Sequence, residues 1–126
     1  MKRAVRTEGA PKAIGPYSQA VRAGGFLFCS GQLPLDPSTG KMVDGGIEAQ
    51  TERVLKNLEA VLNAGGATLR SVVKTTVYLV DMGDFPAMNA VYTKFFPEDP
   101  PARATVQIGK LAAGAFVEID AVAAIG

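Results

Sequence analysis

The stretch IEAQTERVLKNLEAVLNAGGATLRSVVKTTVYL, residues 47–79, contains one helix and the strand that follows it. Apolar residues recur at three- and four-residue intervals over 47–64 and predict an amphipathic helix, which the Gly65-Gly66 pair ends. Residues 72–79 are rich in valine and threonine, a composition that favours a strand in the interior of a sheet. The centre of the chain therefore predicts a fold that combines helix and sheet.

A second helix and two extended runs follow on the C-terminal side. Asp84 can cap a helix with Pro86 in its first turn, and apolar residues at helical spacing continue to Phe95. Residues 103–108 and 115–125 are extended runs separated by a glycine-containing segment. We expect these two runs to pair antiparallel and to close the sheet as a hairpin.

Strands dominate the N-terminal side. Residues 20–31, AVRAGGFLFCSG, place Gly24 and Gly25 between two runs that contain apolar residues, which predicts a hairpin with a two-residue turn. Turn-forming residues fill 33–40, and 41–43 offers another short strand. Strands, helix, strand, helix and a closing hairpin describe an α+β domain with two amphipathic helices on one face of a sheet.

Alternation along the last two runs predicts which side chains lie beneath the helices. The residues suited to burial there are Ala104, Val106, Ile108, Val117, Ile119 and Ala121. The opposite face then receives Arg103, Thr105, Gln107, Glu118 and Asp120. Because this face mixes charged with apolar side chains and lacks helices of its own, we infer that another copy of the chain covers it.

Composition restricts the class of protein. The 126 residues suit a single domain, residues 1–126. The 13 basic and 12 acidic residues give a net charge of +1 without a long run of either sign, so nucleic acid and membrane are unfavoured partners. No apolar run reaches the length of a signal peptide core or a spanning helix, so we expect a cytoplasmic protein.

The scarcity of cysteine and histidine restricts the chemistry. Cys29 is the only cysteine, so an intrachain disulfide or a cysteine-rich metal site cannot form. The chain has no histidine, which excludes Ser/His and Cys/His pairs and histidine metal sites. Without a P-loop, a dinucleotide fingerprint or a calcium loop, the sequence predicts neither metal nor cofactor. Chemistry must use arginine, carboxylates, hydroxyls, backbone groups and water.

The closing hairpin supplies one candidate constellation. In the expected register Thr105 stands opposite Glu118, and Arg103 stands opposite Asp120. The forked donors of an arginine match the two oxygens of a substrate carboxylate, and a nearby glutamate can position or deprotonate water. On spacing alone the same residues more often form an ordinary ion pair on a solvated or subunit-facing sheet. Spacing alone leaves both interpretations open.

Other polar residues are equally ambiguous. Tyr17 and Ser30 lie in segments rich in glycine and proline, where hydroxyls serve turns as well as substrates. Cys29 lies in an apolar run and is predicted to be a small core residue. Asn89 is predicted to be a solvated side chain or a contact in the cap region of the helix. The stripe of Phe85, Met88, Tyr92 and Phe95 reads as core.

Four segments together resemble one family. They are GPYSQAV at 15–21, SGQLPLDPSTG at 30–40, PPARATVQIGKL at 100–111 and FVEIDAVAAI at 116–125. The chain resembles the RidA/YjgF family in these segments, and the similarity runs almost end to end. The resemblance implies a chorismate-mutase-like fold, a mixed β-sheet with two α-helices on one face. It also implies a homotrimer with a cleft between each pair of neighbouring subunits.

The activity implied by the resemblance is hydrolysis of a reactive imine. Deaminases of this family convert 2-imino or enamino acids, such as those derived from 2-aminoacrylate or 2-aminocrotonate, to 2-oxo acids and ammonia without a cofactor. By position, Arg103 matches the arginine that holds the substrate carboxylate, and Glu118 matches the acid that orients the attacking water. Tyr17 matches a residue that closes the cleft, and Ser30 with the Gly31 backbone matches hydrogen-bonding groups of the cleft.

One position departs from the family pattern, and two other functions stay open. Thr105 stands where the best-known deaminases often have cysteine, so a backbone amide contact survives there but a thiol does not. The first alternative is a non-catalytic trimer that binds 2-oxo or amino acids or regulates a partner. The second is an endoribonuclease or translation inhibitor, against which the near-neutral charge and the lack of a basic aromatic groove both argue.

Overall fold

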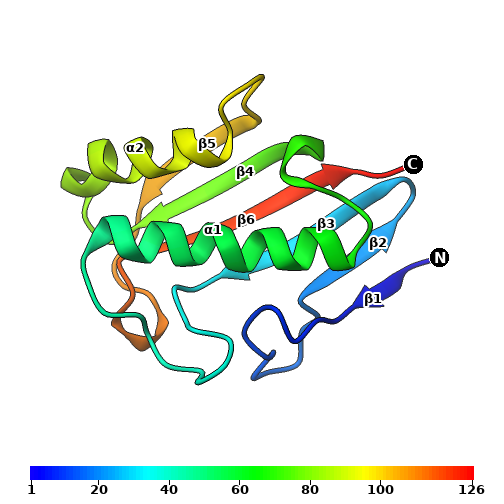
Figure 1. The fold of residues 1–126 in the computed structure, drawn as a ribbon, viewed down its shortest axis with the longest axis horizontal. Helices are drawn as coiled ribbons and strands as arrows, with labels where there is room; N and C mark the ends of the chain where they lie inside the picture. Colours follow the sequence, from blue (N-terminus) through cyan, green and yellow to red (C-terminus); the bar gives the residue numbers. More distant parts are fainter.

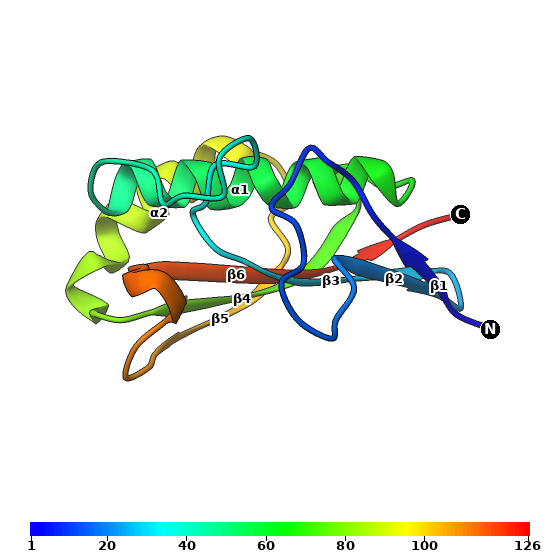
Figure 2. The same ribbon diagram turned by 90° about the horizontal axis from the view of Figure 1, so that it is seen from below.

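Two helices cover one face of a six-stranded sheet in the computed structural model, which describes all of residues 1–126 (Figures 1 and 2). The helices are α1 (Ile47–Ala64) and α2 (Phe85–Phe95). The strands are β1 (Arg3–Val5), β2 (Ala20–Ala23), β3 (Phe26–Gln32), β4 (Val72–Leu79), β5 (Ala102–Gln107) and β6 (Val117–Ala124), in the spatial order β1-β2-β3-β6-β4-β5. The predicted α+β class, with both helices on one face, is confirmed.

The N-terminal hairpin also forms as predicted, but the short strand after it does not. Gly24 and Gly25 join β2 to β3 with φ angles of 56° and 84°, the left-handed region that a two-residue hairpin turn requires. Residues 41–43 contribute only an isolated bridge between Met42 and Leu35. Turn-forming residues fill the loop that precedes this segment, so too few residues remain extended beside it to form a ladder of β-sheet hydrogen bonds.

Both helices lie where the apolar spacing places them. The core-facing side chains of α1 are completely buried, and they are Val54, Leu55, Leu58, Val61 and Leu62. α2 has a proline in its first turn, but the Asp84 carboxylate caps no backbone group there. Instead Asp81 accepts a hydrogen bond of 2.8 Å from the Gly83 amide and caps the short 3-10 turn that precedes α2. Neither helix is long and apolar enough to span a membrane.

The predicted closing hairpin is wrong. β5 and β6 do not pair with each other, because β4 lies between them. β4 pairs parallel with β5 on one side and antiparallel with β6 on the other. α2 connects β4 to β5 and returns the chain to the same end of the sheet, which is the crossover that parallel pairing requires (Figure 1). β5 and β6 follow each other in the sequence, but this closeness did not predict their pairing.

The side chains of β6 face as predicted, but those of β5 are reversed. Val117 and Ile119 are completely buried beneath the helices. Arg103 pairs with Thr75, which is also completely buried on the helix side, so Arg103 lies on the helix side and Val106 on the other. The short segment Ala102–Gln107 buries no side chain fully on either face, so its apolar pattern could not decide the orientation.

The sheet face opposite the two α-helices, here named the open face, carries no α-helix in the single chain (Figure 2). Its side chains include Phe26, Phe28, Lys74, Thr76, Tyr78, Ala104, Val106, Glu118, Asp120 and Val122. Phe26, Phe28 and Val106 are 44%, 47% and 40% exposed, so the face presents apolar side chains to solvent next to two carboxylates. Exposed apolar groups on one continuous face are typical of a surface that packs on another chain.

Candidate functional site

Arg103 is fixed by one stripe of α2. Its Nη1 donates a hydrogen bond of 2.8 Å to Oδ1 of Asn89. The guanidinium carbon lies 4.8 Å from the ring centroid of Tyr92 and 5.4 Å from that of Phe85, within cation–π range. The Tyr92 hydroxyl is in turn 2.7 Å from Oγ1 of Thr75. One nitrogen of the fork is thus committed to the chain, and the remaining donors are available to a planar anion.

Sequence reasoning missed this arrangement. Asn89 was expected to be solvated or near a cap, and the prediction is wrong because its amide accepts the Arg103 hydrogen bond. Tyr92 is buried as expected, but together with the half-buried Phe85 it also bounds the guanidinium. Positions 85, 89 and 92 are spaced by four and three residues, so they share one helix face, a signal present in the sequence.

Thr105 lies two residues beyond Arg103 on the same side of β5. Its Oγ1 is buried and has no hydrogen-bond partner, and no other buried side-chain oxygen or nitrogen in the chain is left unpaired. A buried hydroxyl without a partner costs about 1–3 kcal/mol. A bound ligand or a second chain could therefore supply the missing hydrogen-bond partner on the side of β5 that carries Arg103.

Glu118 lies on the open face, directly against Gly31. The carboxylate occupies the space into which a side chain at Gly31 would project, so only glycine allows this close approach. Burial raises the pKa of Glu118, and the neighbouring charge of Asp120 raises it further. The side chain accepts no hydrogen bond and forms no ion pair within the chain. It is therefore a half-buried carboxylate whose basicity is increased and whose oxygens are free.

Ser30 and Tyr17 belong to the same region of the chain. The Ser30 hydroxyl donates to the carbonyl of Ser18 at 2.6 Å, and the Ser30 amide donates to the carbonyl of Gln19 at 3.0 Å. These bonds tie β3 to the loop that carries Tyr17, whose side chain is 51% exposed. Tyr17 also lines a hollow of about 890 Å³ between the N-terminal loop and residues 37–38. Ser30 thus has its proton committed within the chain, whereas Tyr17 is free to contact a ligand or another chain.

Within one chain the predicted residues form two groups that do not meet. Arg103 pairs in register with Thr75, and Glu118 pairs with Tyr78. Thr75 and Tyr78 are three residues apart on the regular part of β4, so their side chains point to opposite faces. The expected juxtaposition of Arg103 with Asp120, and that of Thr105 with Glu118, is therefore wrong. Glu118, Gly31 and Ser30 lie toward the open face, and Arg103 and Thr105 lie toward α2.

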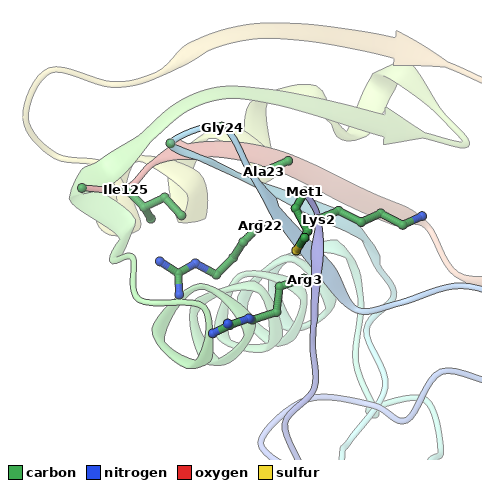
Figure 3. Close-up of a pocket in the computed structure, with 9 residues that line it drawn as sticks. Met1, Lys2, Arg3, Arg22, Ala23, Gly24 and Ile125 are labelled. Carbon is green, nitrogen blue, oxygen red and sulfur yellow. The ribbon is translucent and has the colours of Figure 1, made fainter.

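A basic hollow lies elsewhere, at the end of the sheet where β1 and β2 pair (Figure 3). It measures about 490 Å³, and Lys2, Arg3 and Arg22 contribute to its lining. None of the predicted site residues lines it. No group of three or more histidine, cysteine or acidic side chains in the chain could hold a metal ion.

Cys29 lies in the core beneath the helices and is buried. Burial raises the pKa of its thiol to about 12, and the charge of Asp120 contributes. A thiol with such a pKa carries almost no thiolate near neutral pH, so the interpretation of Cys29 as a core residue agrees with its environment.

Comparison with known proteins gives the family. A family model described as endoribonuclease L-PSP matches residues 7–125. The mouse 2-iminobutanoate/2-iminopropanoate deaminase is 45% identical over 126 residues, covering 100% of this chain and 93% of the mouse protein. The crystal structure of RidA from an Antarctic Psychrobacter superposes with a TM-score of 0.94 at 41% identity, covering 98% of this chain and 99% of that one.

A third similar protein carries a ligand in its structure. The crystal structure of Escherichia coli TdcF with bound serine superposes with a TM-score of 0.94 at 35% identity, covering 98% of this chain and 99% of that one. All three similarities extend over nearly the whole chain and agree with the four segments quoted from the sequence. The chain therefore belongs to the endoribonuclease L-PSP family, which includes the RidA and YjgF proteins.

Proposed function

We propose that this protein is a 2-imino acid deaminase whose sites are completed between copies of the chain. The observation that carries the proposal is the division of the candidate site: an arginine with free donors lies on the helix side, and an unpartnered carboxylate lies on the open face. Neither group alone can hold and hydrolyse a 2-imino acid. The name of the mouse relative and the family resemblance support the same activity.

Three copies in a ring give each site both groups. β5 is an edge strand, so Arg103 lies at the border of the sheet beside α2. If that border packs against the open face of the next copy, each chain contributes its Arg103 to one cleft and its Glu118 to another. Repeated contacts between unlike surfaces close into a ring, and the family resemblance implies that the ring has three members. The exposed phenylalanines of the open face would be buried by the same contact.

In the proposed reaction Arg103 binds the substrate carboxylate and Glu118 activates water. The protonated imine carbon is electrophilic, and water adds to it while Glu118 accepts one proton from that water. Glu118 then returns this proton to the amino group of the carbinolamine, and ammonia leaves as the hydroxyl forms the carbonyl of the 2-oxo acid and releases its own proton to water. Orientation of substrate and water supplies several kcal/mol of the barrier reduction. Burial raises the pKa of Glu118 in the single chain and makes it a stronger base for the first step, whereas Arg103 of the neighbouring copy acts in the opposite direction.

The remaining predicted residues complete the cleft in this proposal. The Thr105 hydroxyl, which lacks a partner in the chain, donates to the substrate carboxylate beside Arg103. The exposed Tyr17 ring closes the cleft, and the region of Ser30 and Gly31 supports Glu118 and offers backbone groups to the ligand. The reaction needs no metal or cofactor, and a cytoplasmic location stays a prediction.

The test is the disappearance of a freshly generated 2-imino acid, with ammonia measured as product. We expect the parent protein to accelerate the reaction and Arg103→Ala to lose at least about 100-fold in kcat/KM, since the carboxylate loses its only cation. Arg70→Ala is the matched control, because Arg70 is exposed and forms only a surface ion pair with Glu98. No acceleration by the parent with any of several imino acids would overturn the proposal.

A second function, ligand binding without catalysis, is favoured by one observation. TdcF has a bound serine in its crystal structure, and serine is a small amino acid with the carboxylate that Arg103 is suited to hold. A binding protein needs Arg103 but not Glu118. Calorimetry with serine and 2-oxobutanoate on Glu118→Gln distinguishes the two, since unchanged binding combined with lost hydrolysis identifies an enzyme.

A further inference from the structure

Two side chains of the open face, Tyr78 and Asp120, lie beside Glu118. Tyr78 pairs in register with Glu118, and Asp120 follows Glu118 by two residues on the same face of β6. The Tyr78 hydroxyl donates a hydrogen bond of 3.1 Å to Oδ2 of Asp120. The direct cross-strand neighbour of Glu118 thus directs its only proton away from Glu118.

Because the Tyr78 hydroxyl donates to Asp120, it does not donate to the oxygens of Glu118. A tyrosine hydroxyl has one proton to donate, and the bond to Asp120 uses it. Had Tyr78 donated to Glu118, the bond would have stabilised the carboxylate and made it a weaker base. Because Tyr78 binds Asp120 instead, both oxygens of Glu118 stay available to water, and a second negative charge stands on the same strand.

Within its own chain few other charges act on Glu118, and the Arg103 of the neighbouring copy, which shares the cleft in the proposed function, is the same in the parent and in every variant compared below. On β4 the open face carries Lys74 and Tyr78, and Lys74 pairs with Val122, beyond Asp120, and forms no ion pair. β3 and β5 contribute no ionisable side chain to the open face. Cys29 of β3 lies on the other side of the sheet, and its charge state is constant over the working range of pH. Asp120 is therefore the one acidic neighbour of Glu118 on the open face of its own chain.

We propose that Asp120, held by the Tyr78 hydroxyl, is a positioning residue that keeps Glu118 free of donors from its own chain and competent to accept a proton from water. The inference rests on the proposed function of Glu118 and assigns it two supporting residues. Asp120 touches neither the substrate nor the water in this scheme and acts only through Glu118.

The first experiment compares the pH dependence of kcat/KM for Asp120→Asn and Tyr78→Phe. Asparagine can still accept the Tyr78 hydrogen bond but has no charge, so the pKa of Glu118 falls. The acid limb, where activity is lost as Glu118 is protonated, then moves to lower pH, and kcat/KM on the plateau decreases roughly three- to tenfold because the base is weaker. Tyr78→Phe keeps the charge of Asp120, so its acid limb does not move to lower pH.

Glu52→Gln is the matched control, because it removes one negative charge from the exposed surface of α1, on the far side of the sheet. Ratios of variant to parent at each pH cancel the protonation of the substrate itself. An unmoved acid limb in Asp120→Asn would overturn the proposal. Equal losses at every pH in Asp120→Asn and Tyr78→Phe would also overturn it, since they would identify a purely structural pair.

A second measurement needs no substrate. Carbon-13 NMR of the glutamate carboxyl groups follows the titration of Glu118 directly, with Glu118→Gln identifying its signal. We expect a lower midpoint in Asp120→Asn than in the parent, and equal midpoints would overturn the inference. If the parent hydrolyses no imino acid, the proposed function fails while this titration still reports whether Asp120 controls Glu118.

Discussion

Arg103 is oriented by contacts that leave most of its donors free, and the Asn89 amide is the only hydrogen-bond partner among them. We expect Asn89→Ala to raise KM about fivefold with little change in kcat. A guanidinium without this hydrogen bond is less well oriented, and it binds the carboxylate more weakly by the same amount in the substrate and in the transition state. Lys94→Ala, an exposed change in the last turn of the same helix, serves as control. Unchanged KM in steady-state kinetics would refute this orienting role.

Glu118 depends on the absence of a side chain at Gly31. A methyl group there would collide with the carboxylate, so Gly31→Ala should displace Glu118 and lower kcat at least about tenfold. The backbone of Gly31 does not lie in the left-handed region, so alanine adds no backbone strain. Gly46→Ala, which projects into open space, should leave kcat unchanged. Equal kcat in Gly31→Ala and the parent would show that Glu118 does not need this position.

Cys29 offers a test of the core that is independent of activity. Because the pKa of the buried thiol is about 12, little thiolate exists at pH 8, and the reactive fraction increases only as the pH approaches that value. Iodoacetamide at pH 8 should label the folded protein at least about 100-fold more slowly than the urea-unfolded chain. Mass spectrometry measures both rates, and rapid labelling of the folded protein would contradict the buried environment.

At the scale of elements, α1 does more than cover the sheet. The buried amide of Asn57 donates to the carbonyls of Leu33 and Leu35 at 3.0 and 2.9 Å, and Arg53 donates to its oxygen at 3.0 Å. These bonds attach the loop after β3 to the helix. The position of Gly31 and Ser30 at the end of β3 therefore depends on α1.

We expect Asn57→Ala to lower the free energy of unfolding by about 2–3 kcal/mol, since two partly buried carbonyls lose their donors and a buried side chain is removed. Arg53→Ala removes a half-buried donor whose place at the Asn57 oxygen water can take, so it should cost about 1 kcal/mol or less, about a third as much. Urea denaturation measures both variants. Similar values for the two would mean that the loop does not need the Asn57 amide.

The elements could be predicted where a strong pattern decides them, and their pairing could not. Val54, Leu55 and Leu58 belong to a long helical pattern, and the boundaries of α1 followed from it. β5 is short and lies at the edge, and its alanines and valine face away from the helices while Arg103 and Thr105 face them, so its alternation indicated the wrong side for Arg103. The family motif made Arg103 and Glu118 candidate site residues, but only the order and register of the strands revealed that they lie on opposite faces.

At the scale of the whole molecule, the proposed trimer predicts a mass of three chains in solution. Light scattering at micromolar concentration should give about three times the 13.1 kDa of one chain, because the open face with Phe26 and Phe28 is otherwise exposed. A monomer under these conditions would exclude sites formed between copies.

Mixing two inactive variants tests the shared site more directly. Arg103→Ala and Glu118→Gln, unfolded together and refolded at equal ratio, should regain about one quarter of the parent's activity. The reason is that random assembly gives about that share of clefts an intact Arg103 from one chain and an intact Glu118 from its neighbour. Each variant refolded alone is the control. No recovery in a mixture that forms trimers would place both groups in one chain.

The placement of Arg103 and Glu118 on opposite sides of one sheet has a consequence for paralogues. If two related chains with compatible edges were produced in the same cell, they would form mixed rings, and some clefts would combine the arginine half of one gene product with the acid half of the other. Such clefts would have substrate preferences that neither gene encodes alone. A change in the residues around Arg103 of one chain would then alter clefts whose Glu118 comes from the other chain, so the two genes would evolve as a pair.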